Sequence, residues 1–320
     1  HGVLNLDSEE EGTLLAGSAG GSRMETRLPV KRQYTEGKRA VLTLTGLQGG
    51  HSGTEIDKGR GNANVLLARV LSALQGEVHY RIVSLEGGEK DNAIPTWSRA
   101  ELLVPFEKTY KLEEICAVCG EELKKEYALT DPELQVQFQY GNETGGDAFD
   151  EKSTETSLAL LLALPNGVQA MSKDIPGLVE TSLNLGIMRT DEKGLALSYA
   201  LRSSVEAEKK HLTGKIKILT EYMGGIAETG GIYPAWEYRR DSGLREDMVR
   251  IYEKMFGKKP EIQVIHAGLE CGILAAKIPN LDCVSMGPEI RDIHTAEERM
   301  SISSVRRMWE YILEIVKTKR

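Results

Sequence analysis

The stretch Gly49-Gly50-His51-Ser52-Gly53 is the part of the sequence around which the rest is organised. It follows Ala40–Thr45, whose alternation predicts a strand, and precedes Asn62–Leu74, whose apolar spacing predicts a helix. Glycines on both sides permit positive φ and a close approach of the backbone to a ligand. His51 is therefore placed to donate a hydrogen bond to charge developing on a substrate oxygen. The alternative is a glycine-rich turn that carries an exposed histidine.

Composition limits the classes of function open to this chain. Its 320 residues suggest two domains, and 40% hydrophobic with 28% charged residues is an ordinary globular balance. The net charge is −8 and no cluster of Lys and Arg stands out, which argues against binding to nucleic acid or to an anionic membrane. No apolar run is long enough to predict a membrane-spanning helix.

Four cysteines in a chain of this length predict reduced thiols and a cytoplasmic protein. Cys116 and Cys119 form a CxxC pair, which raises the possibility of redox or metal chemistry. They share a helical spacing with Leu112, Ile115 and Leu123, and no second CxxC completes a zinc site. The pattern favours the buried face of a helix.

The first residues indicate a strand already under way. The chain begins at His1 without a methionine, so we expect coding sequence upstream. Val3–Leu6 predicts a buried strand that ends at Asp7, and α/β enzymes commonly place ligands at such strand ends. Asp7 is therefore a candidate ligand, with a strand-end cap as the alternative. Leu14–Ala19 predicts a second strand.

The character of the sequence changes near Ser22. Strands now alternate apolar and polar residues, as in half-exposed antiparallel sheets, and helices lie between them. This predicts an α+β domain of two layers over residues 22–232, with no repeat evident in the sequence. The predicted strands include Ala40–Thr45, Val78–Ser84, Leu134–Tyr140 and Leu195–Leu201, and the predicted helices are Asn62–Leu74, Leu112–Tyr127 and Ser157–Leu164.

From Tyr233 onward, strands and helices alternate in the manner of a parallel α/β sheet. Residues 1–21 fit the same sheet, so the middle domain is predicted to be an insertion between 1–21 and 233–320. The predicted elements are helices Ser242–Phe256, Gly268–Ala276 and Ser303–Lys317, and strands Glu261–Ile265 and Leu281–Met286. In the last helix, Val305, Met308, Trp309, Ile312 and Val316 are expected to point inward.

Four more positions are candidates for chemistry. Asn92 follows a Gly-Gly turn, where a turn asparagine bonding its own backbone is the alternative to a substrate contact. Arg202 ends an alternating strand, as a surface arginine or as a bidentate partner for a substrate carboxylate. Gly268 lies in a strand-to-helix turn suited to anions. His294 lies just before the final helix, as a metal ligand or an exposed loop histidine.

Taken together, ten stretches resemble those of the aminoacylhistidine (Xaa-His) dipeptidases, in the dinuclear zinc peptidase and deacylase group that includes carnosinase. The resemblance runs through nearly the whole chain; the ordered set and HAGLECG are specific to it, whereas GGHSG is shared by the wider group. The stretches are NLDSEEEG, GGHSG, GRGNAN, NAIP, LPNGV, VETSLNLG, YPAW, HAGLECG, VSMGP and IHTAEE.

The resemblance implies a fold and a set of roles. The fold is a zinc-binding catalytic α/β domain, here partial, with a large inserted α+β lid domain that matches the insertion described above. Asp7 and His294 match terminal ligands of the two metal ions, and His51 matches the lid histidine that stabilises the oxyanion. Asn92, Arg202 and Gly268 match groups that hold the substrate, including its C-terminal carboxylate.

One departure from the family pattern limits what this chain is expected to do alone. The family's His-x-Asp segment, bridging aspartate and Glu-Glu pair have no counterpart here. The resemblance implies hydrolysis of small Xaa-His dipeptides by a zinc-activated water in a cytoplasmic enzyme, with a homodimer as a further expectation. We expect this chain alone to be inactive. The alternatives are an inactive binding or oligomerisation module, and a related aminopeptidase or N-acyl amino acid deacylase.

Overall fold

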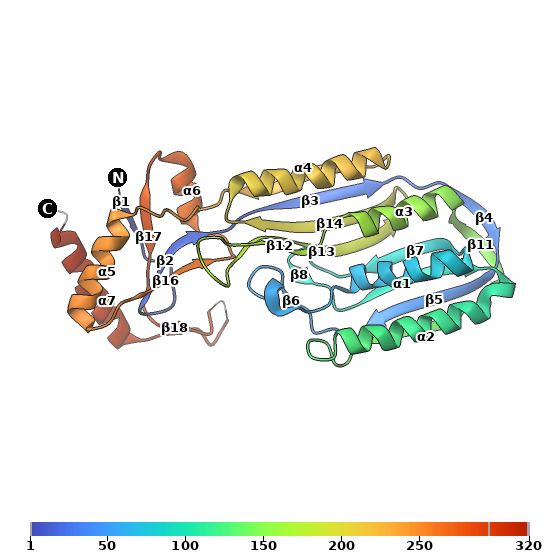
Figure 1. Ribbon diagram of the computed structural model, residues 1–320, viewed down its shortest axis with the longest axis horizontal. Coiled ribbons are helices and arrows are strands. Elements are labelled where there is room, and N and C mark those ends of the chain that lie inside the picture. Colours follow the sequence, from blue (N-terminus) through green and yellow to red (C-terminus); the bar gives the residue numbers. More distant parts are fainter. Residues whose placement is uncertain (1, 294, 319–320) are drawn as a thin grey trace.

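The computed structural model describes residues 2–293 and 295–318, in which two separate sheets lie at opposite ends of the longest axis (Figure 1). We call residues 2–18 and 236–318, without 294, the small-sheet unit and residues 20–233 the large-sheet unit. The chain passes from the first to the second between Ser18 and Gly20 and returns between Tyr233 and Trp236. The predicted domain boundaries at 21/22 and 232/233 stay predictions.

The small sheet has the strand order β1-β17-β2-β16. β1 pairs with β17 and β2 with β16 in parallel, but β17 and β2 are antiparallel, so the expectation of a wholly parallel sheet is wrong. β2 follows β1 after a short turn, without the crossover helix that a parallel pair needs. The elements are β1 (Gly2–Asn5), β2 (Thr13–Ser18), α5 (Gly243–Phe256), β16 (Glu261–Ile265), α6 (Glu270–Lys277), β17 (Asp282–Ser285) and α7 (Ile302–Thr318).

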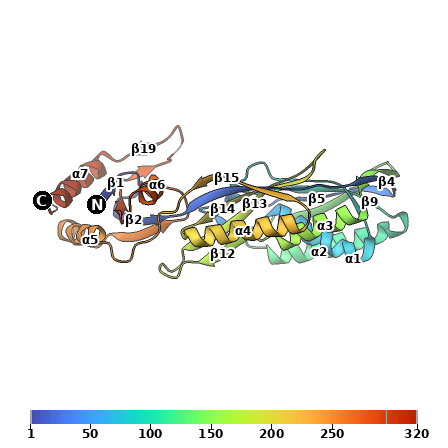
Figure 2. The same cartoon turned by 90° about the horizontal axis from the view of Figure 1, so that it is seen from above.

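The large sheet has nine strands, with the order β10-β5-β9-β7-β13-β14-β3-β15 and β12 beside β13. Four helices cover one face of this antiparallel sheet (Figure 2), as the α+β expectation requires. The strands are β3 (Gly20–Leu28), β5 (Lys38–Thr45), β7 (Arg81–Gly87), β9 (Ser98–Val104), β10 (Gln135–Tyr140), β12 (Gly167–Met171), β13 (Val179–Asp191), β14 (Gly194–Ser203) and β15 (Ile226–Tyr233). The helices are α1 (Ala63–Val78), α2 (Thr109–Glu126), α3 (Glu151–Ala163) and α4 (Glu206–Tyr222).

Three two-stranded pairs account for the remaining strands among the described residues. β4 (Arg32–Glu36) pairs with β11 (Gly145–Phe149), β6 (Gly50–His51) with β8 (Ala93–Ile94), and β18 (Ile290–Arg291) with β19 (Arg299–Met300). Across residues 2–293 and 295–318, no helix is long and apolar enough to cross a membrane.

The large sheet contains a structural repeat that the sequence does not reveal. The order strand, helix, strand, strand, helix, strand occurs as β5-α1-β7-β9-α2-β10, and again as β3 followed by α3-β13-β14-α4-β15. Each copy forms half of the sheet, and the second strand of each, β7 and β13, meet at its centre. The first copy lies in the chain between β3 and α3 of the second.

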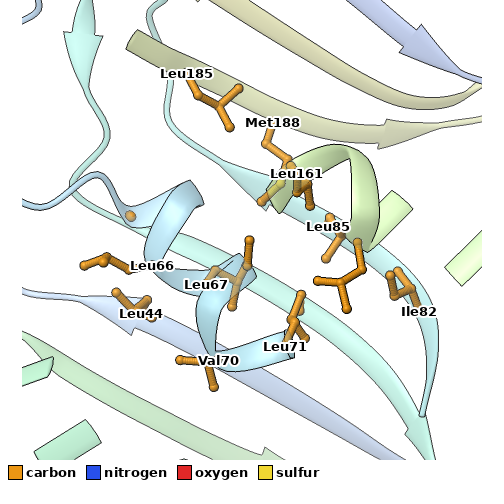
Figure 3. Close-up of a cluster of buried hydrophobic side chains, with 14 of the residues drawn as sticks. Leu44, Leu66, Leu67, Val70, Leu71, Ile82, Leu85, Leu161, Leu185 and Met188 are labelled. Atoms are coloured by element: carbon orange, nitrogen blue, oxygen red, sulfur yellow. The ribbon is translucent and has the colours of Figure 1, made fainter. Parts of the chain in front are cut away.

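One hydrophobic core joins the two copies. Leu67 and Leu71 of α1 are fully buried and pack in the same cluster as Leu161 of α3 and Met188 of β13 (Figure 3). Because these residues come from both copies, the two copies share one core between the sheet and its helices. The N-terminus of α1 is capped by Asn62, whose side chain accepts hydrogen bonds from two backbone N–H groups.

The packing of α7 differs from its predicted orientation. Met308 is buried as expected, together with Tyr311, whose hydroxyl donates to the backbone oxygen of Met248 at 2.6 Å. Val305, Trp309 and Val316, expected to face inward, are 37%, 59% and 49% exposed. The helix carries two apolar stripes, and spacing alone does not indicate which one is covered. On α2, by contrast, Cys116 is buried on the face that the helical apolar spacing predicted, and Cys119 is half-buried.

Candidate substrate site at the junction of the two units

Four residues form a row across neighbouring strands at the end of the large sheet nearest the small one. Ser182 of β13 lies opposite Arg202 of β14, Arg202 opposite Gly21 of β3, and Gly21 opposite Tyr233 of β15. Residues directly opposite in antiparallel strands share a face, so the three side chains of this row are neighbours. β3 and β15 are also the strands through which the chain enters and leaves the unit.

The loop that carries His51 is fixed by its own residues. Gly49 and Gly50 have φ values of 66° and 138°, the left-handed backbone expected of this glycine pair. His51 lies opposite Ala93 in the β6–β8 pair, and its backbone N–H donates to the Glu55 carboxylate at 2.8 Å. The imidazole thus projects from a held backbone.

Hydrogen bonds to the ring define the tautomer of His51. The backbone N–H groups of Gly53 and Thr54 point at Nδ1 from 3.3 and 3.2 Å, so Nδ1 accepts and the proton resides on Nε2. Burial, and then the positive charge of Arg202, lower the pKa of His51, which keeps the ring neutral near pH 7. Nε2 lies 3.4 Å from Nη2 of Arg202. Two donors therefore face each other.

Arg202 is held from its other side. Its Nη1 donates to the hydroxyl of Tyr233 at 3.1 Å, while its Nε is buried without a partner among residues 2–293 and 295–318. Gly268 lies against the same tyrosine, because a β-carbon there would come within 2.8 Å of the ring. His51, Arg202 and Gly268, from three distant segments, are thus brought to one place.

Asn92 adjoins the histidine loop. Its backbone oxygen accepts from the N–H of Ser52 at 2.9 Å. A cavity of about 460 Å³ is lined by His51 and Asn92, and one of about 300 Å³ by Asn92, Arg202 and Tyr233. The Asn184 amide supports this segment by donating to the backbone oxygens on either side of Asn92, those of Asp91 and Ala93.

A buried histidine joins the two units. Nε2 of His266, at the end of β16, lies 2.7 Å from the hydroxyl of Ser182 in the large sheet. Burial lowers the pKa of His266 to about 4, and the charge of Arg202 acts in the same direction. The neutral ring therefore tolerates a position beside the guanidinium.

Asp7 lies in the small-sheet unit, two residues past the end of β1, and is exposed. Its backbone N–H donates to Oδ1 of Asn5 at 2.9 Å, and the amide of Asn5 donates to the Glu270 carboxylate. Partial burial would raise the pKa of Glu270, but hydrogen bonds from Asn5, from its own backbone and from Asp7 hold it below its usual value. Asp7 therefore has a second carboxylate beside it.

The described residues do not assemble a metal site. They contain no group of three or more His, Cys, Asp or Glu side chains that could hold an ion. His294, the other predicted ligand, lies outside the described residues. Asp7 and Glu270 are fewer than the three protein ligands of a catalytic zinc site.

Several residues of this site were not singled out from the sequence, although they lie in the quoted motifs. Ser182 is in VETSLNLG, Tyr233 in YPAW, and His266 and Glu270 in HAGLECG. Their partners are more than 20 residues away along the chain, so the motifs marked the segments but not the contacts.

Comparison with known proteins agrees with this architecture. Residues 42–131 match the model of the peptidase dimerisation domain of the M20 family. The chain is 36% identical, over 98% of its length, to the cytosol non-specific dipeptidase of Escherichia coli (strain K12), of which it covers 65%. The crystal structure of aminoacylhistidine dipeptidase from Vibrio alginolyticus superimposes with a TM-score of 0.94 at 35% identity, over 98% of this chain and 64% of that one.

These similarities define the class: the chain has the fold of an M20 peptidase with its dimerisation domain. The chain is similar to the aminoacylhistidine and cytosol non-specific dipeptidases, which confirms the resemblance found in the sequence motifs. The chain spans about 65% of the length of these relatives.

Proposed function

We propose that this chain supplies the substrate-binding part of a metal-dependent dipeptidase. Arg202 binds the C-terminal carboxylate of the dipeptide, and Nε2 of His51 donates to the oxygen of the scissile carbonyl. The observation that carries the proposal is the pair of donors, His51 Nε2 and Arg202 Nη2, which face each other at 3.4 Å.

Two facing donors leave a place for an acceptor. Neither N–H satisfies the other, and a ligand that offers an oxygen to each of the two donors removes the conflict. Hydrogen bonds between charged partners contribute about 1.5–3 kcal/mol, so a carboxylate beside Arg202 is the strongest occupant. In a dipeptide, the carboxylate follows the scissile carbonyl after a single residue, which suits adjacent arginine and histidine groups. A longer peptide carries its carboxylate away from this pair.

Asn92 and Gly268 complete the proposed substrate site. Asn92 lines the cavities on both the His51 and the Arg202 side, where its amide can bond either end of the ligand. Gly268 precedes the N-terminus of α6, where backbone N–H groups without helical partners favour negative charge. Both assignments rest on position together with the family resemblance.

The metal assignments rest on the resemblance alone. We propose that Asp7 and His294 each contribute a ligand to a pair of zinc ions in the complete enzyme. Bound zinc would activate the attacking water. The proposal for His51 and Arg202 does not depend on these ligands, because it follows from contacts within residues 51–233.

The remaining assignments also stay proposals. Residues 22–232 would act as the lid, and the E. coli relative, named as a cytosol protein, supports a cytoplasmic location. The match to a dimerisation domain supports a homodimer. β7 is the outermost strand of the first copy of the repeat, and it is already paired with β13 of the same chain at the centre of the large sheet. A dimer therefore has to use another surface.

A ligand series tests the proposed substrate class. Calorimetric titration of the chain with an Xaa-His dipeptide, its C-terminal amide, a tripeptide and an N-acyl amino acid compares the four. We expect the dipeptide to bind at least about ten-fold more tightly than its amide, and the tripeptide to bind more weakly than the dipeptide. Equal binding of acid and amide would contradict the carboxylate site, and preference for the N-acyl amino acid would favour a deacylase.

A further inference from the structure

Tyr233 occupies an unusual position in the row of residues beside the candidate site. Its direct neighbour on β3 is Gly21, and a β-carbon at Gly21 would collide with the tyrosine ring. The ring therefore lies over the glycine and reaches the next strand, where its hydroxyl accepts a hydrogen bond from Nη1 of Arg202 at 3.1 Å. No residue larger than glycine leaves room for this path.

The tyrosine is fixed on its other sides as well. Its ring packs against Gly268, where a β-carbon would lie 2.8 Å from the ring. Its backbone oxygen accepts from the ammonium group of Lys209 at 2.7 Å, and that buried lysine also pairs with Glu206 at 2.9 Å. Tyr233 thus connects α4, the row on the large sheet and the turn before α6.

We propose that Tyr233 is a positioning residue for substrate binding, which reaches across Gly21 and holds the Arg202 guanidinium in register with His51. The inference rests on the proposed function, in which Arg202 binds the C-terminal carboxylate. An arginine side chain has several rotatable bonds, and anchoring Nη1 holds Nη2 beside His51. Removal of the hydroxyl frees the guanidinium without removing its charge.

The test compares a dipeptide with its C-terminal amide in calorimetric titrations of the chain. Tyr233→Phe removes only the hydroxyl, and Tyr222→Phe, at a residue that is 88% exposed, is the matched control. We expect Tyr233→Phe to raise Kd for the dipeptide by about five- to ten-fold, because the anchor of the arginine is lost while its own bonds to the carboxylate remain, and Kd for the amide by less than about two-fold. The control should change neither value.

A second variant tests the route across the sheet. Gly21→Ala displaces the ring, so it should produce the same selective loss of dipeptide binding. Gly76→Ala, where a β-carbon meets nothing within 4 Å, is its control. Circular dichroism verifies that each variant folds.

The outcomes separate the inference from the proposed function. If Tyr233→Phe weakens the dipeptide and the amide equally, or changes neither, Tyr233 does not position the arginine and the inference is wrong. If the unmodified chain binds acid and amide alike, the carboxylate site itself is wrong, and the role of Tyr233 is rejected with it.

Discussion

The two units of the molecule differ in how their buried apolar residues are arranged. In the large-sheet unit, one core runs through both copies of the repeat, and Leu67 and Leu71 are fully buried. In the small-sheet unit, the buried apolar residues form two separate clusters, one that contains Met248 and one that contains Trp236. The comparison indicates that the proposed substrate site belongs mainly to the unit with the single core, where Arg202 lies in the row across the sheet. The small-sheet unit adds Asp7, after β1, and Glu270, at the start of α6.

The largest effect is expected from His51, which the large-sheet unit contributes. In a complete, metal-loaded enzyme, His51→Ala should lower kcat by about 10²–10³, as the loss of one oxyanion donor does. Zinc affinity should change little, because His51 is not a proposed ligand. The exposed His211→Ala is the control. Equal losses of kcat and zinc affinity would count against the oxyanion role.

The contact between the units should be sensitive to pH through His266. Its pKa is about 4 in the folded protein, below its ordinary 6.5, so the unfolded chain takes up the proton first as pH falls. The contribution of the neutral ring to the free energy of unfolding is fully present above pH 6.5 and is lost between pH 6.5 and pH 4. The loss is about 1.4 kcal/mol per pH unit and about 3 kcal/mol in total.

Urea unfolding at pH 7 and pH 4 measures this loss. The unfolding free energy should fall between pH 7 and pH 4, and we expect this fall to be about 3 kcal/mol smaller in His266→Gln than in the unmodified chain. In the control His211→Gln, the fall should be the same as in the unmodified chain. An unchanged pH dependence in His266→Gln would show that the contact with Ser182 does not depend on a neutral ring.

Removal of the Arg202 charge should have the next largest effect. Arg202→Met keeps much of the side-chain volume, and should raise Kd for a dipeptide by about 10- to 100-fold with little change for the amide. Arg189→Met, on the same sheet and exposed, is the matched control. If the two variants lose dipeptide binding equally, general electrostatic attraction rather than a specific carboxylate contact is responsible.

The smallest effect is expected on the outer face of α7. Trp309→Ser should change the unfolding free energy by less than about 0.5 kcal/mol, because the indole is mostly exposed. Met308→Ala, at the preceding and buried residue, should cost about 2–3 kcal/mol. Chemical denaturation of both variants measures the difference. Similar costs would mean that the outer stripe of α7 is covered in solution.

Local signals in the sequence were enough to predict some elements. The helix at Asn62–Leu74 and the one at Ser242–Phe256 were predicted because a helical apolar spacing lies within each segment, and α1 and α5 confirm them. The insertion of an α+β region between two parts of an α/β region followed from the same periodicities. α4 was not predicted, since its buried face mixes Leu212 and Ile216 with Lys209 and Thr220.

The contacts of the site could not be predicted in the same way. His51, Arg202 and Gly268 were chosen individually, and their convergence depends on strand register across a doubled sheet that shows no repeat in its sequence. The role of Gly21 is visible only once Tyr233 is known to lie opposite. Register of this kind is set by pairing between distant segments, which one sequence does not encode locally.

The central claim is that Nε2 of His51 carries a proton and is placed, beside Arg202, to donate a hydrogen bond to a substrate oxygen. Nuclear magnetic resonance of isotope-labelled histidine tests it most directly, by reporting the tautomer at pH 7 and the response to a dipeptide. We predict that Nε2 is protonated and Nδ1 is not, and that only the Nε2 resonance of His51 shifts strongly when the dipeptide binds. A proton on Nδ1, or no response at Nε2 on binding, would contradict the account.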